Sequence, residues 1–187
     1  NVGKDAKRKT MQSYIYAQHL NSQGQELWAS GGLVMSRSTF RQQNNLRMAS
    51  NGNNGAWLTW EDGSTAPKKI YVQYVNEQGE LAFNQDVLIS NNGVNPQIVA
   101  DGQNGVWVVW EAALTTSKDI YAQYIQPDGA KRFADTGIVV CNANNNQVTP
   151  RMVLTDKGGI IVTWGDTRSG NEDVYAQHVA GDGRTVW

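Results

Sequence analysis

The sequence has very little cysteine, little net charge and no long apolar segment. A single cysteine, Cys141, among 187 residues excludes an intrachain disulfide framework and any multi-cysteine metal site, so we expect this thiol to pack as a small apolar residue. The net charge of −1 gives no support for a basic, nucleic-acid-binding face. No apolar run approaches the roughly 18 residues of a membrane-spanning helix, so neither nucleic acid nor membrane insertion is expected.

The residues that are abundant indicate a globular β protein. Hydrophobic residues make up 40% of the chain and charged residues 18%, which is enough apolar material for a sizeable core. Seven Trp, seven Tyr and 19 Gly, with many Asn and Gln, suggest short strands joined by tight polar turns. No signal peptide is visible, and because the sequence begins at Asn1 we expect a leader or further domains outside these residues.

The strongest signal is an internal repeat in a fixed register. The string Ile/Val-Tyr-x-Gln begins four times, at spacings of 55, 50 and 54 residues: Ile15, Ile70, Ile120 and Val174. A tryptophan lies ten residues before three of these starts: Trp60, Trp110 and Trp164. An aromatic residue lies thirteen residues after each start: Trp28, Phe83, Phe133 and Trp187. A glycine turn keeps the same step, so the chain repeats one structural environment.

Each repeat is expected to contain four short antiparallel strands. In the clearest copy these are residues 96–101, 106–112, 119–125 and 137–141, with Gly, Asn and Asp between them where hairpins need positive φ. The second strand is apolar on both faces, as in a strand covered on both sides. Four strands in about 50 residues are typical of a blade, so the predicted fold class is an all-β, β-propeller-type array of four-stranded antiparallel blades. A sandwich or solenoid of hairpins is the alternative.

The repeat also predicts the domain organisation. We expect one partial propeller domain over residues 1–187, with a half unit at about 1–45, units at 46–95 and 96–149, and an incomplete unit at 150–187. A closed propeller has roughly four to eight blades. About 3.5 units of ~50–55 residues would therefore form part of a larger propeller, or a piece completed by another copy or chain.

The last repeat carries a family resemblance. Residues 164–183 read Trp-x-Asp-x-Arg-x-Gly, then Asp-Val-Tyr-Ala-Gln, then Asp-Gly. This pattern resembles the propeller repeats of large secreted or surface proteins of bacteria, especially the Bacteroidota, and is more distantly similar to the TolB-type propeller repeat. The resemblance implies a role as an adhesin segment, an accessory domain of an exported enzyme or a part of secretion machinery. The middle repeat departs from the pattern, because it lacks the counterparts of Asp166 and Arg168.

The histidines are expected to be structural. His19 and His178 fall in the slot that Tyr74 and Tyr124 occupy in the other repeats. A slot that accepts either residue suits an aromatic ring with a polar tip, packed partly against a neighbour. No catalytic triad and no zinc-binding pair stands out.

A tyrosine and a glutamine recur in every third strand. They are Tyr16, Tyr71, Tyr121 and Tyr175, with Gln18, Gln73, Gln123 and Gln177. Because a buried amide needs partners, we expect each glutamine to bond the backbone of the neighbouring blade or the adjacent tyrosine hydroxyl. A ring of amides that lines a central channel and binds a ligand is the alternative.

Four carboxylates follow the tryptophan strands: Glu61, Asp62, Glu111 and Asp166. Paired carboxylates can hydrolyse glycosides. These positions begin loops, however, where the acids are expected to accept turn hydrogen bonds or to pair with Lys68, Lys118 or Arg168. No catalytic residue, metal ligand or cofactor is predicted, with calcium at residues 165–173 as an alternative suggested by the oxygen ligands there.

Length variation is confined to the connections between repeats, which we expect to share one rim with the loops after the second strands. Because loops on a rigid scaffold carry function, this rim is the predicted binding surface. Its candidate ligand-binding residues are Arg37, Phe40, Arg41, Gln42, Asn44, Asn91, Asn92, Asn144, Asn145, Asp166 and Arg168. The predicted partners are a cell-surface glycan or protein, besides the rest of the propeller or another chain.

The predicted function is accordingly a non-enzymatic binding or structural module of a larger secreted protein, acting in adhesion or carbohydrate binding outside the cell or at its surface; the periplasm is an alternative location. Two alternatives remain open: an accessory propeller domain of an exported glycoside hydrolase or peptidase, and a scaffold component of a secretion or surface-filament assembly.

Overall fold

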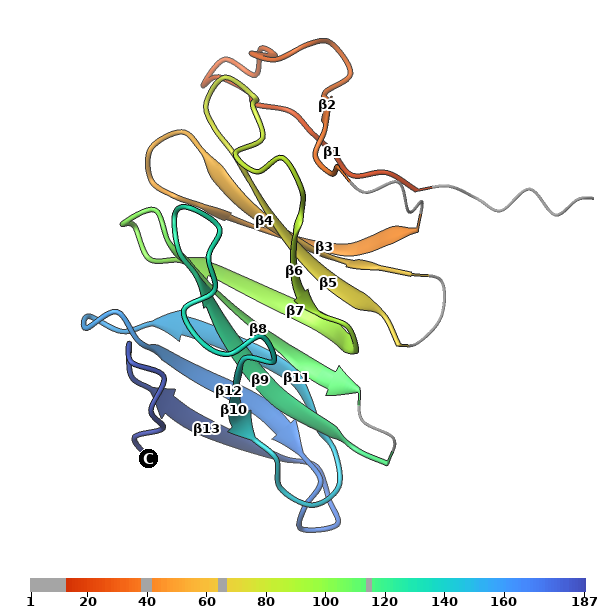
Figure 1. The fold of residues 1–187 in the computed structure, drawn as a ribbon, viewed down its shortest axis with the longest axis vertical. Coiled ribbons are helices and arrows are strands. Elements are labelled where there is room, and N and C mark those ends of the chain that lie inside the picture. Colours follow the sequence, from red (N-terminus) through yellow and green to blue (C-terminus); the bar gives the residue numbers. More distant parts are fainter. Residues whose placement is uncertain (1–12, 38–41, 64–66, 114–115) are drawn as a thin grey trace, which may run out of the picture.

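The fold consists of β-sheets arranged in chain order. The computed structural model describes residues 13–37, 42–63, 67–113 and 116–187. In this part of the chain thirteen strands form four antiparallel sheets of two, four, four and three strands, and there is no helix (Figure 1). It follows that no described segment is a helix capable of crossing a membrane.

We number the sheets along the chain. Sheet 1 holds β1 (Tyr16–Ala17) and β2 (Leu33–Val34). Sheet 2 holds β3 (Gln43–Ser50), β4 (Ala56–Asp62), β5 (Lys69–Val75) and β6 (Val87–Ser90). Sheet 3 holds β7 (Gly93–Ala100), β8 (Val106–Ala113), β9 (Lys118–Ile125) and β10 (Ile138–Cys141). Sheet 4 holds β11 (Gln147–Leu154), β12 (Ile160–Asp166) and β13 (Asp173–Val179). In every sheet each strand pairs with the next one along the chain, as predicted for the repeats.

The turns use the residues that the repeat predicted. Between the first and second strands of sheets 2 and 3, Asn54 and Asn104 adopt φ of 58° and 69°. Between the third and fourth strands, Gly79 and Gly129 adopt φ of 82° and 87°. Asparagine and glycine tolerate this left-handed region, so the local sequence fixes where each hairpin reverses.

The first strand of each larger sheet begins earlier than the apolar pattern indicated. β7 starts at Gly93, three residues before the expected start at 96, because the strand continues through a register shift between Val94 and Gln97. The same shift occurs in β3 and β11. The bulge residues are Asn45, Asn95 and Thr149, with φ of 52°, 54° and 53°. A bulge adds one unpaired residue, which a period-2 pattern alone does not reveal.

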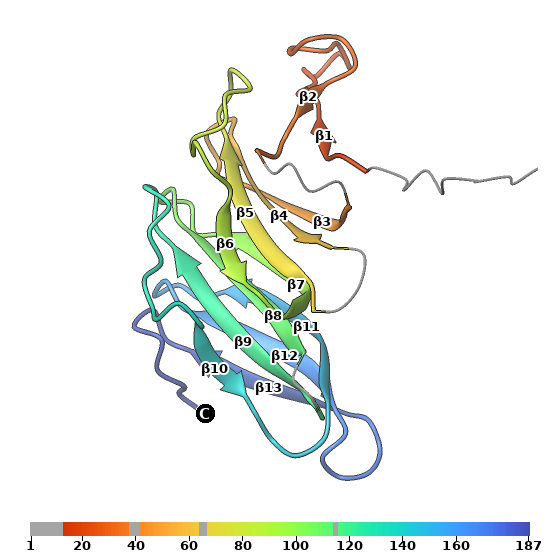
Figure 2. The same ribbon diagram turned by 45° about the vertical axis from the view of Figure 1, so that its right-hand side comes forward.

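The core lies between successive sheets, which stack face to face (Figures 1 and 2). Trp57 and Trp110 share one buried cluster between sheets 2 and 3, and Trp107 and Trp164 share the next, between sheets 3 and 4. Trp107 and Trp110 are 0% and 1% exposed, so neither ring is a surface platform. Burying such a ring stabilises the fold by about 2–3 kcal/mol.

The recurring glutamines bond each third strand to the connection that follows it in the same sheet. This differs from the expected bond to a neighbouring blade. Gln123 Nε2 donates to the carbonyl oxygens of Phe133 and Ala134, and Gln123 Oε1 accepts from the backbone N–H groups of Tyr124 and Phe133. Gln18, Gln73 and Gln177 likewise bond the backbone ten residues further on. The predicted partners, the backbone of a neighbouring blade or the adjacent tyrosine hydroxyl, were wrong. Each glutamine instead bonds the backbone of the aromatic residue that recurs ten positions after it. These side-chain amides are bound to backbone groups within their own sheets, which leaves the ligand-binding alternative without support.

Candidate ligand groove between sheets 2 and 3

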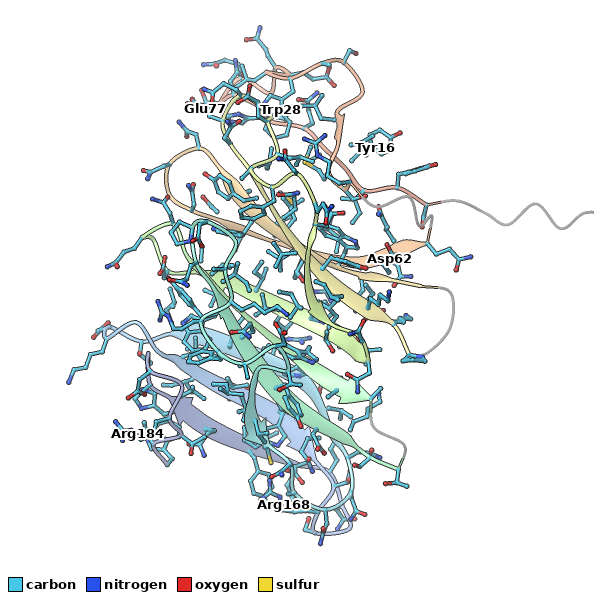
Figure 3. The ribbon with its side chains drawn as sticks, viewed as in Figure 1. Tyr16, Trp28, Asp62, Glu77, Arg168 and Arg184 are labelled. Atoms are coloured by element: carbon cyan, nitrogen blue, oxygen red, sulfur yellow. The ribbon has the colours of Figure 1, made fainter. Side chains whose placement is uncertain are left out.

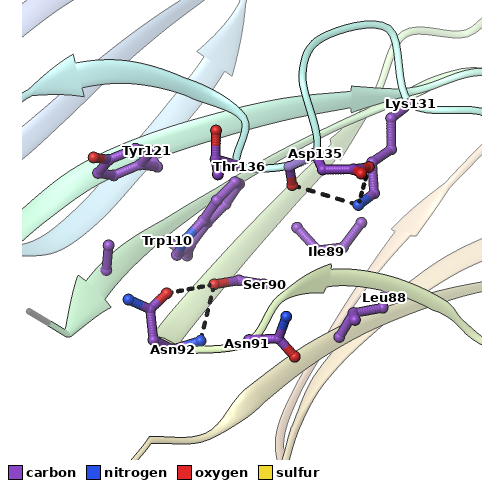
Figure 4. A pocket seen from close by; sticks show the side chains of 11 residues that line it. Leu88, Ile89, Ser90, Asn91, Asn92, Trp110, Tyr121, Lys131, Asp135 and Thr136 are labelled. Atoms are coloured by element: carbon purple, nitrogen blue, oxygen red, sulfur yellow. Dashed lines mark hydrogen bonds and ion pairs between the residues drawn. The ribbon is translucent and has the colours of Figure 1, made fainter.

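A cavity of about 420 Å³ opens between the outer strand of sheet 2 and the facing side of sheet 3 (Figure 4). We call it the groove. It is lined by Leu88, Ile89, Ser90, Asn91, Asn92, Trp110, Ala112, Tyr121, Lys131, Asp135 and Thr136. Trp110 and Tyr121 form an aromatic base whose ring centroids are 6.1 Å apart, and amide, hydroxyl and charged groups surround it. An aromatic base with a few polar groups is the usual composition of a small-ligand site.

The polar rim of the groove keeps hydrogen-bonding capacity for a ligand. Asn91 is exposed, and no described residue bonds its side-chain amide. Lys131 Nζ lies 3.1 Å from Asp135 Oδ1, but the Asp135 side chain is 94% exposed. An ion pair so open to water contributes little, so Lys131 can engage another anion. Ser90 Oγ donates to Asn92 Oδ1 at 3.1 Å and helps to fix the Asn92 amide.

Trp110 supplies an indole donor that has no acceptor among the described residues, although its Nε1 atom keeps a small solvent-accessible area. Its side chain is 1% exposed, and no described residue accepts a hydrogen bond from Nε1. In sheet 4 the corresponding Trp164 donates from Nε1 to Asp166 Oδ2 at 2.9 Å. Sheet 3 has Ala112 where sheet 4 has Asp166, so the acceptor is missing. Trp60 Nε1 in sheet 2 is also without a partner, although Asp62 stands at the position of Asp166, so the carboxylate alone does not produce the bond and the Trp–Asp pair is specific to sheet 4.

One cross-strand pair distinguishes sheet 3 from sheets 2 and 4 beside the groove. At the start of the first strand Gln43 faces Asp62 in sheet 2, and Gln147 faces Asp166 in sheet 4. In sheet 3 the corresponding pair is Gly93 and Ala112, so two long polar side chains are replaced by almost none. A Cβ on Gly93 would lie 2.4 Å from Ile70 Cδ1 and 2.9 Å from Trp110 Cδ1, so only glycine fits here.

Sheet 4 fills the equivalent space with its own charges. Arg168 donates to Asp166, and its guanidinium carbon lies 4.1 Å from the centre of the Tyr175 ring (Figure 3). Arg168 Nη2 also lies 3.0 Å from Cys141 Sγ. Burial raises the pKa of the Asp166 carboxyl, but hydrogen bonds from Arg168 and Trp164 outweigh it and hold the pKa well below its usual range. Asp166 and Arg168 therefore stabilise the fold by pairing with each other.

Glu61 and Glu111 hold neighbouring sheets together. Glu61 Oε1 accepts from Asn45 Nδ2 in its own sheet and from the Asn95 N–H of sheet 3, both at 2.7 Å. Glu111 Oε1 accepts in the same way from Asn95 Nδ2 at 2.7 Å and from the Thr149 N–H of sheet 4 at 2.8 Å. We call this series of bonds the carboxylate ladder.

The remaining oxygens of the ladder are paired with lysine, as the sequence suggested. Lys68 Nζ lies 2.5 Å from Glu61 Oε2, and Lys118 Nζ lies 2.8 Å from Glu111 Oε2. Burial raises the pKa of Glu61, but the hydrogen bonds from Lys68, Asn45 and Asn95 lower it by more. The net pKa therefore lies below its usual range. Carboxylates engaged in this way are unsuited to act as a general acid or nucleophile.

The predicted rim residues do not form one site. Asn91 and Asn92 line the groove. Arg37 lies far along the chain from them, with its backbone N–H bonded to Asp86, and borders a separate hollow between sheets 1 and 2. Gln42 and Asn44 lie at the beginning of sheet 2, while Phe40 and Arg41 fall outside the described residues.

The rim residues of sheet 4 are mostly engaged within the fold. Asn145 Nδ2 donates to the Thr167 carbonyl oxygen at 3.2 Å, while Asn144 is exposed. Asp166 and Arg168 form the ion pair described above. The groove residues absent from the predicted set are Trp110 in a ligand role, Tyr121, Lys131, Asp135 and Thr136. The available signal was the departure of the middle repeat at Ala112.

The structure shows the surroundings of the two histidines and of the segment considered for calcium. His19 packs edge-on to Trp28, and His178 packs edge-on to Trp187, with ring centroids 5.7 Å apart in both pairs. The Trp28 indole in turn donates to the Glu77 carbonyl oxygen at 2.8 Å, where sheet 1 meets sheet 2 (Figure 3). Within the described part of the chain no three His, Cys, Asp or Glu side chains group as metal ligands. In the segment proposed for calcium, Asp173 Oδ2 accepts from Ser169 Oγ, so that geometry lends calcium no support.

The class of protein that the fold defines is an all-β chain of successive antiparallel sheets, and solved structures share it. The chain matches the structure of a "putative glycoside hydrolase" from Bacteroides ovatus ATCC 8483 with a TM-score of 0.50 and 8% identity, over 93% of this chain and 54% of the other. A glycosyl hydrolase from Bacteroides ovatus matches with a TM-score of 0.48 and 9% identity, over 97% and 59%. A further "putative glycoside hydrolase", from Parabacteroides distasonis ATCC 8503, matches with a TM-score of 0.49 and 8% identity, over 97% and 60%.

The match with a TM-score of 0.50 shows a shared fold alone. The chain spans somewhat more than half the length of the solved chains that it matches. No protein-family model matches the sequence. No curated protein matches it either.

Proposed function

We propose that the chain is a β-propeller segment of a larger exported bacterial protein that acts on glycans, and that it binds carbohydrate in the groove. The observation that carries this proposal is the groove itself: an aromatic base, an unbonded indole N–H and a polar rim in one cavity. Sugars offer hydroxyls to amides and apolar faces to aromatic rings, so this chemistry suits them. The structural similarity to a glycoside-hydrolase chain supports the propeller assignment and the accessory role, and a location outside the cytoplasm is part of the proposal.

A binding role fits the described residues better than direct catalysis. Glycoside hydrolysis uses two carboxyl groups that face a shared cleft about 5–10 Å apart. Glu61 and Glu111 are bound in the carboxylate ladder, and Asp166 is bound to Arg168. The one carboxylate that lines the groove is Asp135.

The test is a glycan array with the full chain, followed by titration calorimetry of the oligosaccharides that bind. Asn91→Ala removes an exposed amide from the rim and is expected to weaken binding about 3- to 10-fold, the worth of one or two hydrogen bonds. Asn144→Ala is the matched control, because it removes an exposed amide from the equivalent connection before sheet 4.

Two results would contradict the proposal. Equal affinities for both variants and the unaltered chain would move the binding surface away from the groove. Release of reducing sugar from a polysaccharide panel by this chain alone would make it an enzyme and not an accessory segment.

A further inference from the structure

Sheet 4 contains an internal example of what the groove lacks. There the buried Trp164 indole donates to a carboxylate, Asp166, at 2.9 Å. In the groove the corresponding Trp110 indole is equally buried, and Ala112 leaves it without an acceptor. A ligand that supplies an acceptor for this N–H gains a hydrogen bond inside the groove.

The charges around the groove favour an anionic acceptor. Lys131 lines the cavity, and its only described ionic partner is the highly exposed Asp135 carboxylate. Hydrogen bonds to ionised acceptors are roughly twice as strong as those between neutral groups. A carboxylate is therefore the acceptor that gains most from Trp110, as Asp166 does from Trp164.

We infer that the groove binds the carboxylate of an acidic sugar, with Trp110 Nε1 as the donor and Lys131, which lines the same cavity, as the cation. This inference rests on the proposed carbohydrate-binding function and names the class of sugar. The rest of the pyranose would meet the Tyr121 ring and the amides of Asn91 and Asn92, which line the same cavity. In sheet 4 the position over the corresponding ring, Tyr175, is filled by Arg168.

The experiment follows the Trp110 indole directly. The full chain, labelled with ¹⁵N, is titrated with sodium glucuronate and separately with glucose, and the indole N–H resonances are recorded. Trp110→Phe identifies the resonance by its loss, while retaining an aromatic ring. Glucuronate is expected to shift the Trp110 resonance with an affinity at least about 10-fold higher than that of glucose, the worth of one hydrogen bond to a charged group. Galacturonate and mannuronate are titrated in the same way, because the stereochemistry of the sugar is left open.

Ala112→Asp is the decisive variant. It places a carboxylate in the lining of the groove, so it is expected to shift the Trp110 resonance without ligand and, by repelling an anionic sugar, to weaken uronate binding by about 10-fold or more. If this variant unfolds, Trp110→Phe replaces it, with the same expected loss of affinity. Asp156→Asn, an exposed site away from the groove, is the control and should leave the affinity unchanged.

The outcomes separate the two proposals. Comparable binding of glucose and all three uronates in the groove overturns the carboxylate inference and leaves the carbohydrate-binding function in place. Uronate binding that does not move the Trp110 resonance, and that Ala112→Asp does not change, overturns the inference as well. The absence of binding by any array glycan or any of these sugars overturns both.

Discussion

Sheets 3 and 4 are built on the same plan and differ in how they treat their polar groups. Sheet 3 carries Glu111 in the carboxylate ladder and Gly93 and Ala112 beside the groove. Sheet 4 has Gly165 at the ladder position, and the Asp166–Arg168 pair where sheet 3 is open. One copy of the repeat thus uses its carboxylate to bond to the next sheet and leaves a cavity beside it. The other pairs its carboxylate with an arginine of its own sheet. Duplication of a sheet fixes the scaffold, while a few substitutions decide where it stays open.

Breaking the ladder in sheet 3 should have the largest effect on stability. Glu111→Ala leaves Asn95 Nδ2, the Thr149 N–H and Lys118 without their acceptor. We expect the free energy of unfolding to fall by about 3 kcal/mol, measured by urea denaturation, because buried groups lose their partner. Asp156→Ala, on the surface, should change it by less than about 0.5 kcal/mol.

Acid should weaken the ion pair of sheet 4. The pKa of Asp166 is lower in the folded chain than its ordinary value of 3.8, so its contribution to stability is fully present above that value and is lost as the pH falls through the lower, folded pKa. We expect a loss of about 2 kcal/mol between pH 5 and acid conditions. Glu61, whose pKa is also lowered, contributes in the same direction.

Asp166→Asn isolates the part due to sheet 4. This variant should be less stable at pH 7 and show a flatter acid dependence in thermal unfolding at a series of pH values. An acid dependence identical to that of the unaltered chain would mean that Asp166 does not control it.

The two glycines should respond differently to an added methyl group. Gly93→Ala places Cβ against Ile70 and Trp110 in the core, at an expected cost of about 1–2 kcal/mol. Gly165→Ala meets the end of the Glu172 side chain at 2.5 Å, an exposed group that can move away, so the expected cost is below about 0.5 kcal/mol. Thermal unfolding of the pair tests this, and equal costs would contradict the close packing of sheet 2 against sheet 3.

Local features of the sequence predicted most of the fold. The alternation of apolar residues and the spacing of Asn and Gly turns depend on neighbouring residues, so the strands and hairpins could be read directly. The start of β7 was placed too late because the bulge at Asn95 interrupts the alternation. The partner of Gln123 was assigned to another blade, because periodicity shows that an amide recurs and does not show which way it points.

The groove could not be predicted from any one segment. It depends on the register that sets Gly93 opposite Ala112, on the outer strand of sheet 2, and on a loop twenty residues further along. Asn91 and Asn92 were predicted as binding residues from loop composition, and that role remains a prediction. The sequence shows that position 112 carries alanine and no acidic residue. Only the structure shows that the acidic residue at the corresponding position of sheet 4, Asp166, accepts a hydrogen bond from Trp164.

The carboxylate ladder also has a consequence for how the molecule unfolds. Each glutamate joins the bulge of its own sheet to the backbone of the sheet that follows, so neighbouring repeats are energetically coupled. In a linear array of repeats, stability is the sum of the intrinsic terms and such nearest-neighbour terms. Loss of Glu111 would therefore weaken the coupling of sheet 4 to sheet 3, which the buried cluster around Trp107 and Trp164 would still maintain in part, and would broaden the unfolding transition.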